Sequence, residues 1–509
     1  MSSISLRNNP GAISTARQLG RSQALVDQAM LRLSTGLRIN RAADDAAGLA
    51  VSEKMRAQIG GLSQASRNAR DAASLAQTAE GGLAEIGNIL LRMRNLGVQA
   101  ISDTNTTSDR TALQTEMTAL QAEVTRLAES SEFNGLKLLD GSFIGKRFQV
   151  GANPGQELRL SIGGIDSSSL GAGVAATNGT IASAKAAAVP LTSNGVAPQT
   201  LTVRGPSGTG SIAVAASSTA ETIASQITAS AAGVTARAET NVRITATAPG
   251  SGVAHVHFIL GSSDGGGVLT GSSPIDAQIL ANGDLSEVIT RINQQSSASG
   301  ISAVAGSSVT EMILTQASGK DIILQDSFAD AGAGPTSLLS ATGLAASATS
   351  STLSAVGSGV AIPVNGAAIV GGAVRLSSSG SLSVSTSSAG TLFSSSTASS
   401  SSASLSNMSV ASADQAMASI DVVDAALLTV NDERANLGAF QNRIDATISN
   451  LESSIENLTM AESRVRDADV AIEASQLARS LVLVEAGVAV MAQANQSPRL
   501  ALRLLGIAA

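Results

Sequence analysis

Two hydrophobic repeats at opposite ends of the chain constrain its fold more than any other feature. In each repeat, apolar residues recur at alternating steps of four and three, which places them on one face of a helix. The repeat near the C-terminus consists of Ile444, Ile448, Leu451, Ile455 and Leu458, and the one near the N-terminus of Val26, Met30, Leu33 and Leu37. An apolar seam of this length needs a partner, and the simplest partner of each seam is the other.

The middle of the chain has a different pattern. Residues 165–410 are rich in Ser, Ala, Gly and Thr, with the alternation that is typical of strands. We therefore expect an α+β fold: a long antiparallel α-helical coiled-coil rod formed by both termini, with one or more inserted, mainly β outer domains. Two repeat-like units are expected near residues 200–250 and 270–326, each a short helix followed by a hairpin. The serine-rich segment 394–406 is expected to be a loop or a poorly constrained sheet edge.

Local signals set the expected limits of the N-terminal helices. Asn9 and Pro10 predict a helix start, and Gly36 predicts its end. A second helix is expected over about 46–100 and a third over about 109–129, with Ser108 and Asp109 as its caps. The pair Asn134-Gly135 predicts a tight hairpin turn, because both residues tolerate the left-handed conformation that such a turn requires.

Composition excludes several classes of protein. The chain has 509 residues and no cysteine, which excludes disulfides, cysteine-ligated zinc, iron–sulfur clusters and thiol catalysis. Its net charge is -7 and it has no dense basic cluster, so nucleic acid is not an expected partner. No uninterrupted run reaches the roughly 18 apolar residues of a membrane span, so we expect no membrane insertion. The N-terminus also lacks the apolar core of a secretory signal.

Few residues suggest catalysis or metal binding. Asp44 and Asp45 are adjacent carboxylates with no nearby histidine, which is more typical of a turn than of an acid–base pair. His255 and His257 would share one face of a strand, but the sequence indicates no further ligands for a metal. No His-Glu-x-x-His or Gly-Lys-Ser/Thr phosphate-binding pattern occurs. We expect neither an enzyme nor a bound cofactor or metal.

Motifs at both ends resemble those of bacterial flagellins, the subunits of the flagellar filament. The N-terminal matches are Leu33 to Asn40, Ala42 to Gly48, Phe133 to Gly135 and Phe148 to Asn153. The C-terminal matches are Leu437 to Arg443, Glu456 to Leu458, Ala461 to Asp469 and Gln493 to Asn495. So many separate matches, in order and at both ends, identify the chain as a member of this family.

The resemblance implies an organisation in layers. Residues 1–40 and 467–509 would be the terminal helices in the filament core, and residues 41–165 with 412–466 a helical layer with a β-hairpin around them. Residues 166–411 would form the variable outer domains. The implied function is polymerisation into the helical filament used for swimming, with extracellular localisation after type III export. Implied partners are other copies of the chain, an export chaperone, the filament cap and the hook-junction proteins.

The resemblance also implies exposure to host innate sensing by Toll-like receptor 5. Arg92, Leu96 and Glu116 match the main contact positions of the family. Asn95 stands where a glutamate is usual and Gly97 where an alanine is usual, and the glycine lowers helix propensity by roughly 1 kcal/mol.

Two alternatives and one modification stay open at this stage. The same terminal helices would suit a hook-filament junction protein, which assembles only in short rings. They would also suit a secreted adhesin with flagellin-like ends, whose residues 166–411 would bind a receptor by themselves. The abundance of Ser and Thr in the middle permits O-linked glycosylation, which the family shows on exposed loops, but drift in composition explains the same residues.

Overall fold

The computed structural model describes residues 9–189, 193–230, 232–249, 252–330, 335–347 and 353–504. The chain divides into two compact units. The first comprises Met1–Ala76, Gly145–Leu160 and Ala439–Ala509, and the second comprises Gln77–Ile144 and Ser161–Gly438. The three layers expected above concern packing in a filament, which a single chain does not test, so that division stays a prediction.

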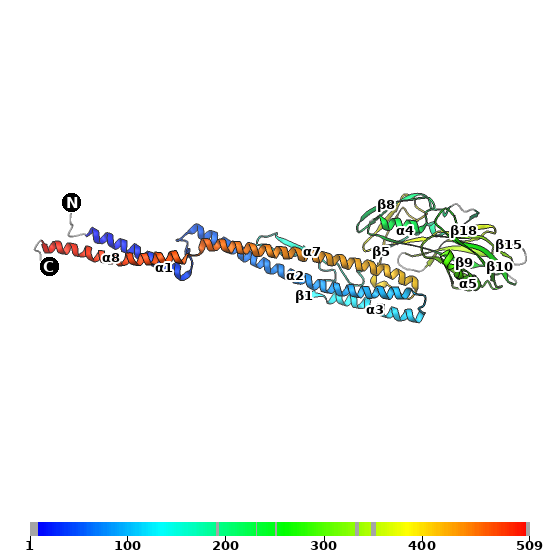
Figure 1. The fold of residues 1–509 in the computed structure, drawn as a ribbon, viewed down its shortest axis with the longest axis horizontal. Helices are drawn as coiled ribbons and strands as arrows, with labels where there is room; N and C mark the ends of the chain where they lie inside the picture. The colour runs from blue at the N-terminus through cyan, green and yellow to red at the C-terminus, as the bar shows by residue number, and fades with distance from the viewer. Residues whose placement is uncertain are drawn as a thin grey trace. The chain divides into compact units, whose positions relative to one another are not determined.

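Five helices form the two ends of the chain. They are α1 (Pro10–Thr35), α2 (Ala46–Ile101), α3 (Thr107–Ser130), α7 (Ala413–Arg466) and α8 (Val470–Leu504). Within the first unit α1 packs antiparallel to α8, and the start of α1 lies beside the C-terminal half of α8 (Figure 1). Terminal helices that pack on one another and a β-sheet middle confirm the predicted α+β class.

The ends of α1 follow from its capping residues. The Asn9 side chain accepts a hydrogen bond from the Ala12 N–H, and Pro10 occupies the first turn, where no backbone donor is needed. Gly36 ends the helix in the left-handed conformation, with a φ of 72°. Leu37 therefore lies outside the helix and pairs with Asp467 in an antiparallel bridge. The predicted seam ends within α1 at Leu33, which is a correction.

The start of α3 differs from the prediction. Its N-cap is Thr106, whose hydroxyl accepts from the Asp109 N–H, while the Asp109 carboxylate accepts from the Thr106 N–H. This reciprocal capping box satisfies two backbone donors, so Asp109 acts inside the first turn and Ser108 is not a cap. The turn between β1 (Glu132–Phe133) and β2 (Leu136–Lys137) is as predicted, because Asn134 and Gly135 have φ values of 51° and 76°.

A second hairpin belongs to the first unit. Strands β3 (Lys146–Gln149) and β4 (Glu157–Leu160) pair antiparallel. The Phe148 ring packs on that of Phe440 of α7, with 6.1 Å between the ring centroids. The Asn68 amide of α2 donates to the Gln149 carbonyl at 3.1 Å. These contacts fix the hairpin against both helices.

The middle of the chain forms three larger antiparallel sheets in the second unit. The six-stranded sheet contains β6 (Ala184–Ala188), β10 (Ala254–Ser263), β11 (Thr270–Ile279), β14 (Asp321–Asp330), β15 (Pro335–Thr336) and β18 (Gly366–Val370). The eight-stranded sheet contains β5 (Gly171–Ala176), β9 (Thr235–Ala246), β12 (Ile301–Ala305), β13 (Glu311–Gln316), β16 (Leu339–Ala346), β17 (Leu353–Ala361), β19 (Ala373–Ser378) and β22 (Ser401–Ser404). The four-stranded sheet contains β7 (Gln199–Gly205), β8 (Gly208–Val214), β20 (Ser383–Thr386) and β21 (Thr397–Ser399).

Two aliphatic cores hold these sheets together. One is built around Phe258 with the buried face of α5 (Ser286–Gln294), and the other around Phe393 with the buried face of α4 (Ala220–Ala229). The remaining described helical segments are short: α6 (Ser296–Ser299) and the 3-10 turns η1 (Thr180–Ala182) and η2 (Leu405–Asn407).

One prediction about the middle is wrong in part. The helix of each repeat-like unit is present, but α4 is followed by the single twelve-residue strand β9, where a hairpin was expected. Strand β9 pairs with β13, β16 and β19, so its length is set by partners distant in sequence. The serine-rich segment, expected as a loop or a sheet edge, contains the edge strands β21 and β22, which pair with β20 and β5. Ladder hydrogen bonds use the backbone, so exposed serine side chains do not prevent them.

Candidate assembly surface

Helix α8 is apolar but almost unburied. Among its residues 470–496, whose burial the structure describes, only Glu473 and Ser480 are buried. Its exposed apolar side chains are Val470, Ile472, Leu481, Val482, Leu483, Val488 and Val490, between 46% and 64% exposed. This surface has no 3.5-residue repeat, so the periodicity of the sequence does not reveal it. A helix apolar on all sides is itself a sign that every side requires cover.

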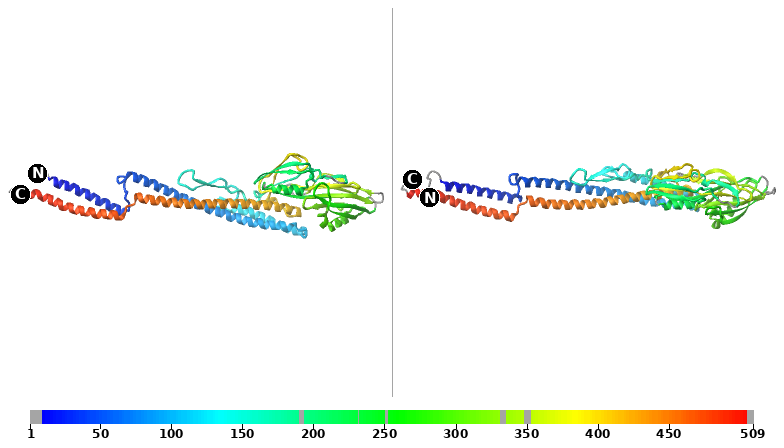
Figure 2. Two further views of the ribbon diagram at one scale, coloured as in Figure 1. Left: turned by 45° about the horizontal axis from the view of Figure 1, so that its top comes forward. Right: turned by 90° about the horizontal axis from the view of Figure 1, so that it is seen from above.

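The partner helix α1 leaves this surface open. Polar groups join the two helices: Arg32 and Glu473 form an ion pair at 2.9 Å, and the Asn9 amide donates to the Ala494 carbonyl at 2.8 Å. The two helices run side by side (Figure 2). In α1, Val26 is buried and Leu33 half-buried, whereas Met30 is 58% exposed. Further exposed apolar residues of α1 are Ile13 and Leu25. We call the exposed apolar residues of α1 and α8 the terminal apolar surface.

One segment of α8 is also long and apolar enough to cross a membrane. Residues Val470–Gln496 reach a mean hydropathy of 1.5, and 6% of that window is buried. Glu485 interrupts the apolar run, so an uninterrupted stretch is absent here, but alanine and valine raise the mean hydropathy across the interruption. By length and composition alone this is one candidate span in the described part of the chain.

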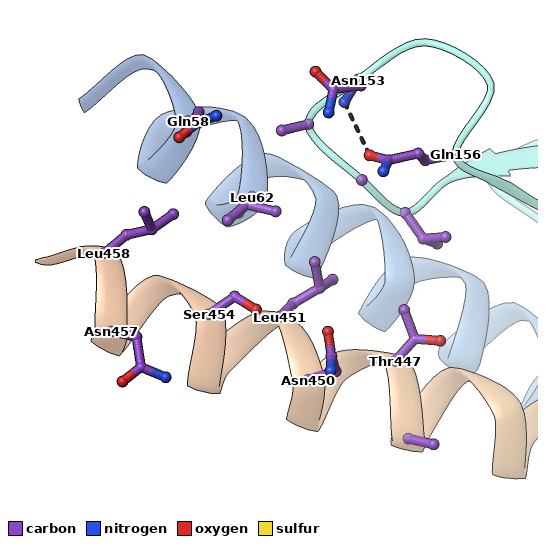
Figure 3. Close-up of a pocket in the computed structure, with 14 residues that line it drawn as sticks. Gln58, Leu62, Asn153, Gln156, Thr447, Asn450, Leu451, Ser454, Asn457 and Leu458 are labelled. Atoms are coloured by element: carbon purple, nitrogen blue, oxygen red, sulfur yellow. Dashed lines mark hydrogen bonds between the residues drawn. The ribbon is translucent and has the colours of Figure 1, made fainter. Parts of the chain in front are cut away.

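The predicted C-terminal seam lies in α7 of the first unit. Ile444 and Leu451 are buried, while Ile448, Ile455 and Leu458 are half-buried. A groove of about 750 Å³ opens along this part of α7, between it, α2 and the β3–β4 loop (Figure 3). Of the seam residues, Leu451 and Leu458 line this groove.

Both apolar and amide side chains line the groove. Leu62, Leu451 and Leu458 supply apolar surface, and the amides around them come from Gln58, Asn153, Gln156, Asn450 and Asn457. The Asn153 N–H donates to the Gln156 side-chain oxygen at 3.0 Å, which stabilises the loop beside the groove (Figure 3). An apolar centre with an amide rim suits a protein segment better than a small charged ligand.

The residues matched to receptor recognition lie in the second unit. The Arg92 guanidinium donates twice to one Glu116 oxygen, at 2.8 and 2.6 Å, on the exposed faces of α2 and α3. Leu96 is 1% exposed, so the structure brings Arg92 and Glu116 together at the surface but not Leu96. Leu91 and Val98 are the exposed apolar residues nearby in sequence.

Gly97 has a packing role that the sequence did not reveal. A Cβ atom at this position would lie 3.0 Å from Ile420 Cγ1 of α7, closer than nearly all real contacts. The glycine therefore lets α2 and α7 approach closely within the second unit, which offsets its low helix propensity.

The residues considered for catalysis have structural contacts. The Asp44 carboxylate accepts from the Asn40 and Arg41 N–H groups, and these bonds hold its pKa below the usual range. Asp45 accepts from the Gly48 N–H at 2.8 Å. His257 Nε2 lies 3.7 Å from Asp276 on the neighbouring strand. Within the described residues, no three His, Cys, Asp or Glu side chains come together as a metal site.

Comparisons with known proteins give consistent results. Residues 7–143 match the bacterial flagellin N-terminal helical region, and residues 420–505 match the C-terminal one. The B-type flagellin of Pseudomonas aeruginosa is 37% identical over 504 residues, covering 99% of each chain. A flagellin of Salmonella rubislaw is 32% identical over 98% of this chain and 99% of its own. The solved structure of FliC from Burkholderia pseudomallei covers 73% of this chain and 99% of its own, at 18% identity and a TM-score of 0.29.

Proposed function

We propose that this chain, which belongs to the bacterial flagellin family, polymerises through its terminal apolar surface. As a flagellin it is a structural subunit of the flagellar filament. The observation that supports the proposed contact is the exposure of seven large apolar side chains on α8, beside a partner helix bound to it through polar groups.

Assembly provides the cover that this surface lacks. Full burial of one Val or Leu side chain contributes about 1.5–3 kcal/mol of stabilising free energy. Burying these seven half-exposed side chains on assembly would therefore stabilise the polymer by several kcal/mol per chain. The two ends of such a chain present different surfaces, and contacts between unlike surfaces that do not close form an open helical polymer. Other copies of the same chain are therefore the proposed cover.

The groove between α2, α7 and the β3–β4 loop is a second proposed contact. Its occupant would be a segment of a neighbouring copy, since the apolar centre and amide rim match the composition of a subunit interface. The half-buried seam residue Leu458, which lines the groove, would complete its burial there.

Several properties follow from this function as proposals. The filament drives swimming and is extracellular, with the chain reaching it by type III export. An export chaperone, the filament cap and hook-junction proteins are its proposed partners, and it has no catalytic role. The exposed Arg92–Glu116 pair is the proposed centre of recognition by Toll-like receptor 5, with Leu96 acting through packing beneath it.

Electron microscopy of purified monomer tests the assembly. After seeding or salting-out, we expect long tubes from the full chain and none from a chain that lacks residues 467–509. Short rings from the full chain would favour a hook-filament junction protein. If neither chain assembled, or if the truncated chain formed equal tubes, the terminal helices would not drive polymerisation. Intact mass, compared with the bare chain, tests glycosylation in the same preparation.

A further inference from the structure

Two arginines face one another where the β-sheets meet α7 in the second unit. Arg237 of β9 and Arg375 of β19 are direct cross-strand partners. Like charges in this position destabilise a sheet unless an anionic group lies close to them. Asp421 of α7 supplies one such group, since its carboxylate lies 3.0 Å from Arg237 Nε and its side chain is only 7% exposed.

Arg375 lacks an equivalent partner. Its Nε is buried and has no hydrogen-bond partner, and no carboxylate among the described residues lies within 4 Å of its guanidinium. Asp421 and Glu239 act on it only at longer range, and burial lowers the pKa of Arg375. Burial also raises the pKa of Glu239, so the charged form of this carboxyl is disfavoured. Arg375 as a whole is half-buried, and its Nε–H has lost water without gaining an acceptor, which costs free energy.

A small polar pocket lies beside this arginine. Its volume is about 150 Å³, roughly ten times the ~15 Å³ that one water needs. Its polar side chains are those of Arg375, Ser402, Ser404, Asn407, Ser409, Gln415 and Ser419. Gln415 accepts from Ser409 through its side-chain oxygen, which leaves its amide nitrogen as a further donor. The Ser419 hydroxyl already donates to the Ser409 carbonyl, so the remaining donors are those of Arg375, the Gln415 amide and the other polar side chains, and no carboxylate lines the pocket.

We infer that this pocket binds a small oxyanion such as phosphate or sulfate, with the Arg375 guanidinium as its principal ligand. The planar fork of arginine donates two parallel hydrogen bonds to a tetrahedral oxyanion, which a chloride ion cannot accept in the same way. The bound anion would connect β19 and β22 to the first turns of α7 and stabilise that part of the second unit.

Calorimetric titration of the monomeric full chain tests the site. Sodium phosphate and sodium sulfate are added at low ionic strength, and sedimentation velocity confirms that the chain stays monomeric. We expect one site per chain with a Kd no weaker than about 1 mM. Arg375→Gln should weaken binding at least about tenfold, because it removes charge-assisted hydrogen bonds. The matched control is Arg204→Gln, an exposed arginine of β7 in the same unit, which should bind as the unmodified chain does.

A second variant distinguishes loss of binding from loss of the folded structure. Arg375→Lys keeps the charge but loses the fork, so binding should be intermediate while circular dichroism stays unchanged. Saturable binding of either oxyanion that is lost in Arg375→Gln supports the site. Absence of saturable binding, equal binding of chloride, or equal loss in Arg204→Gln would each overturn it.

Discussion

Val482 offers a sharp test of the terminal apolar surface. Its side chain is 64% exposed in the single chain and lies on α8 among other exposed apolar residues. If assembly buries this face, Val482→Glu both removes hydrophobic contact and places a carboxylate where no partner is expected. The single chain should tolerate the change, because the new side chain is solvated there.

The size of the effect follows from the exposed fraction. Full burial of a valine is worth about 1.5–3 kcal/mol, and 64% of that is about 1–2 kcal/mol. An unpaired buried charge adds several kcal/mol, so the combined loss is at least about 3 kcal/mol per contact. At about 1.4 kcal/mol per factor of ten, the critical concentration for polymerisation should rise at least about a hundredfold.

Sedimentation of polymer across a series of chain concentrations measures this critical concentration. The control is Val304→Glu on β12, where the valine is 62% exposed but belongs to the second unit. We expect this control to assemble at the unmodified concentration. Assembly of Val482→Glu at the unmodified concentration, or an equal defect in both variants, would refute the reasoning.

Three further predictions concern pH, packing and recognition. Burial raises the pKa of Asp321 to about 7, so the folded state binds a proton that the unfolded state releases above about pH 4. The contribution of Asp321 to the stability of the second unit should therefore be largest at low pH and fall by about 2–4 kcal/mol as pH rises from 5 to 8. Asp321→Asn should flatten that dependence in denaturant titrations, and an unchanged slope would count against it. Gly97→Ala should lower the Tm, since the new Cβ would crowd Ile420. On the same helix, the Cβ of Gly87→Ala would meet nothing within 4 Å, so this variant should stabilise the chain by up to about 1 kcal/mol. Calorimetry that gave both variants a change in Tm of the same sign would contradict the packing argument. Arg92→Ala should weaken Toll-like receptor 5 activation in a reporter-cell assay, whereas Arg126→Ala, which removes a similar exposed pair with Glu123, should not; equal responses would remove Arg92 from the proposed contact.

Local chemistry made much of the helical framework predictable. Asn9, Pro10 and Gly36 define the limits of α1 because capping and the left-handed conformation depend on a few neighbouring residues. Asn134 and Gly135 form the predicted turn for the same reason. The family motifs at both ends were readable as well, and the full-length relatives confirm the assignment.

Long-range packing decided the remainder. The position of Leu96 beneath the surface, the pairing of β21 and β22, and the length of β9 each depend on partners far away in the sequence. The pocket at Arg375 exists because a strand partner and a helix from different parts of the chain meet there. The sequence by itself determined which segments become helices and which family they belong to, because caps, periods and motifs are local. Only the tertiary structure decided which apolar residues stay exposed on α8, because burial depends on what the rest of the chain covers.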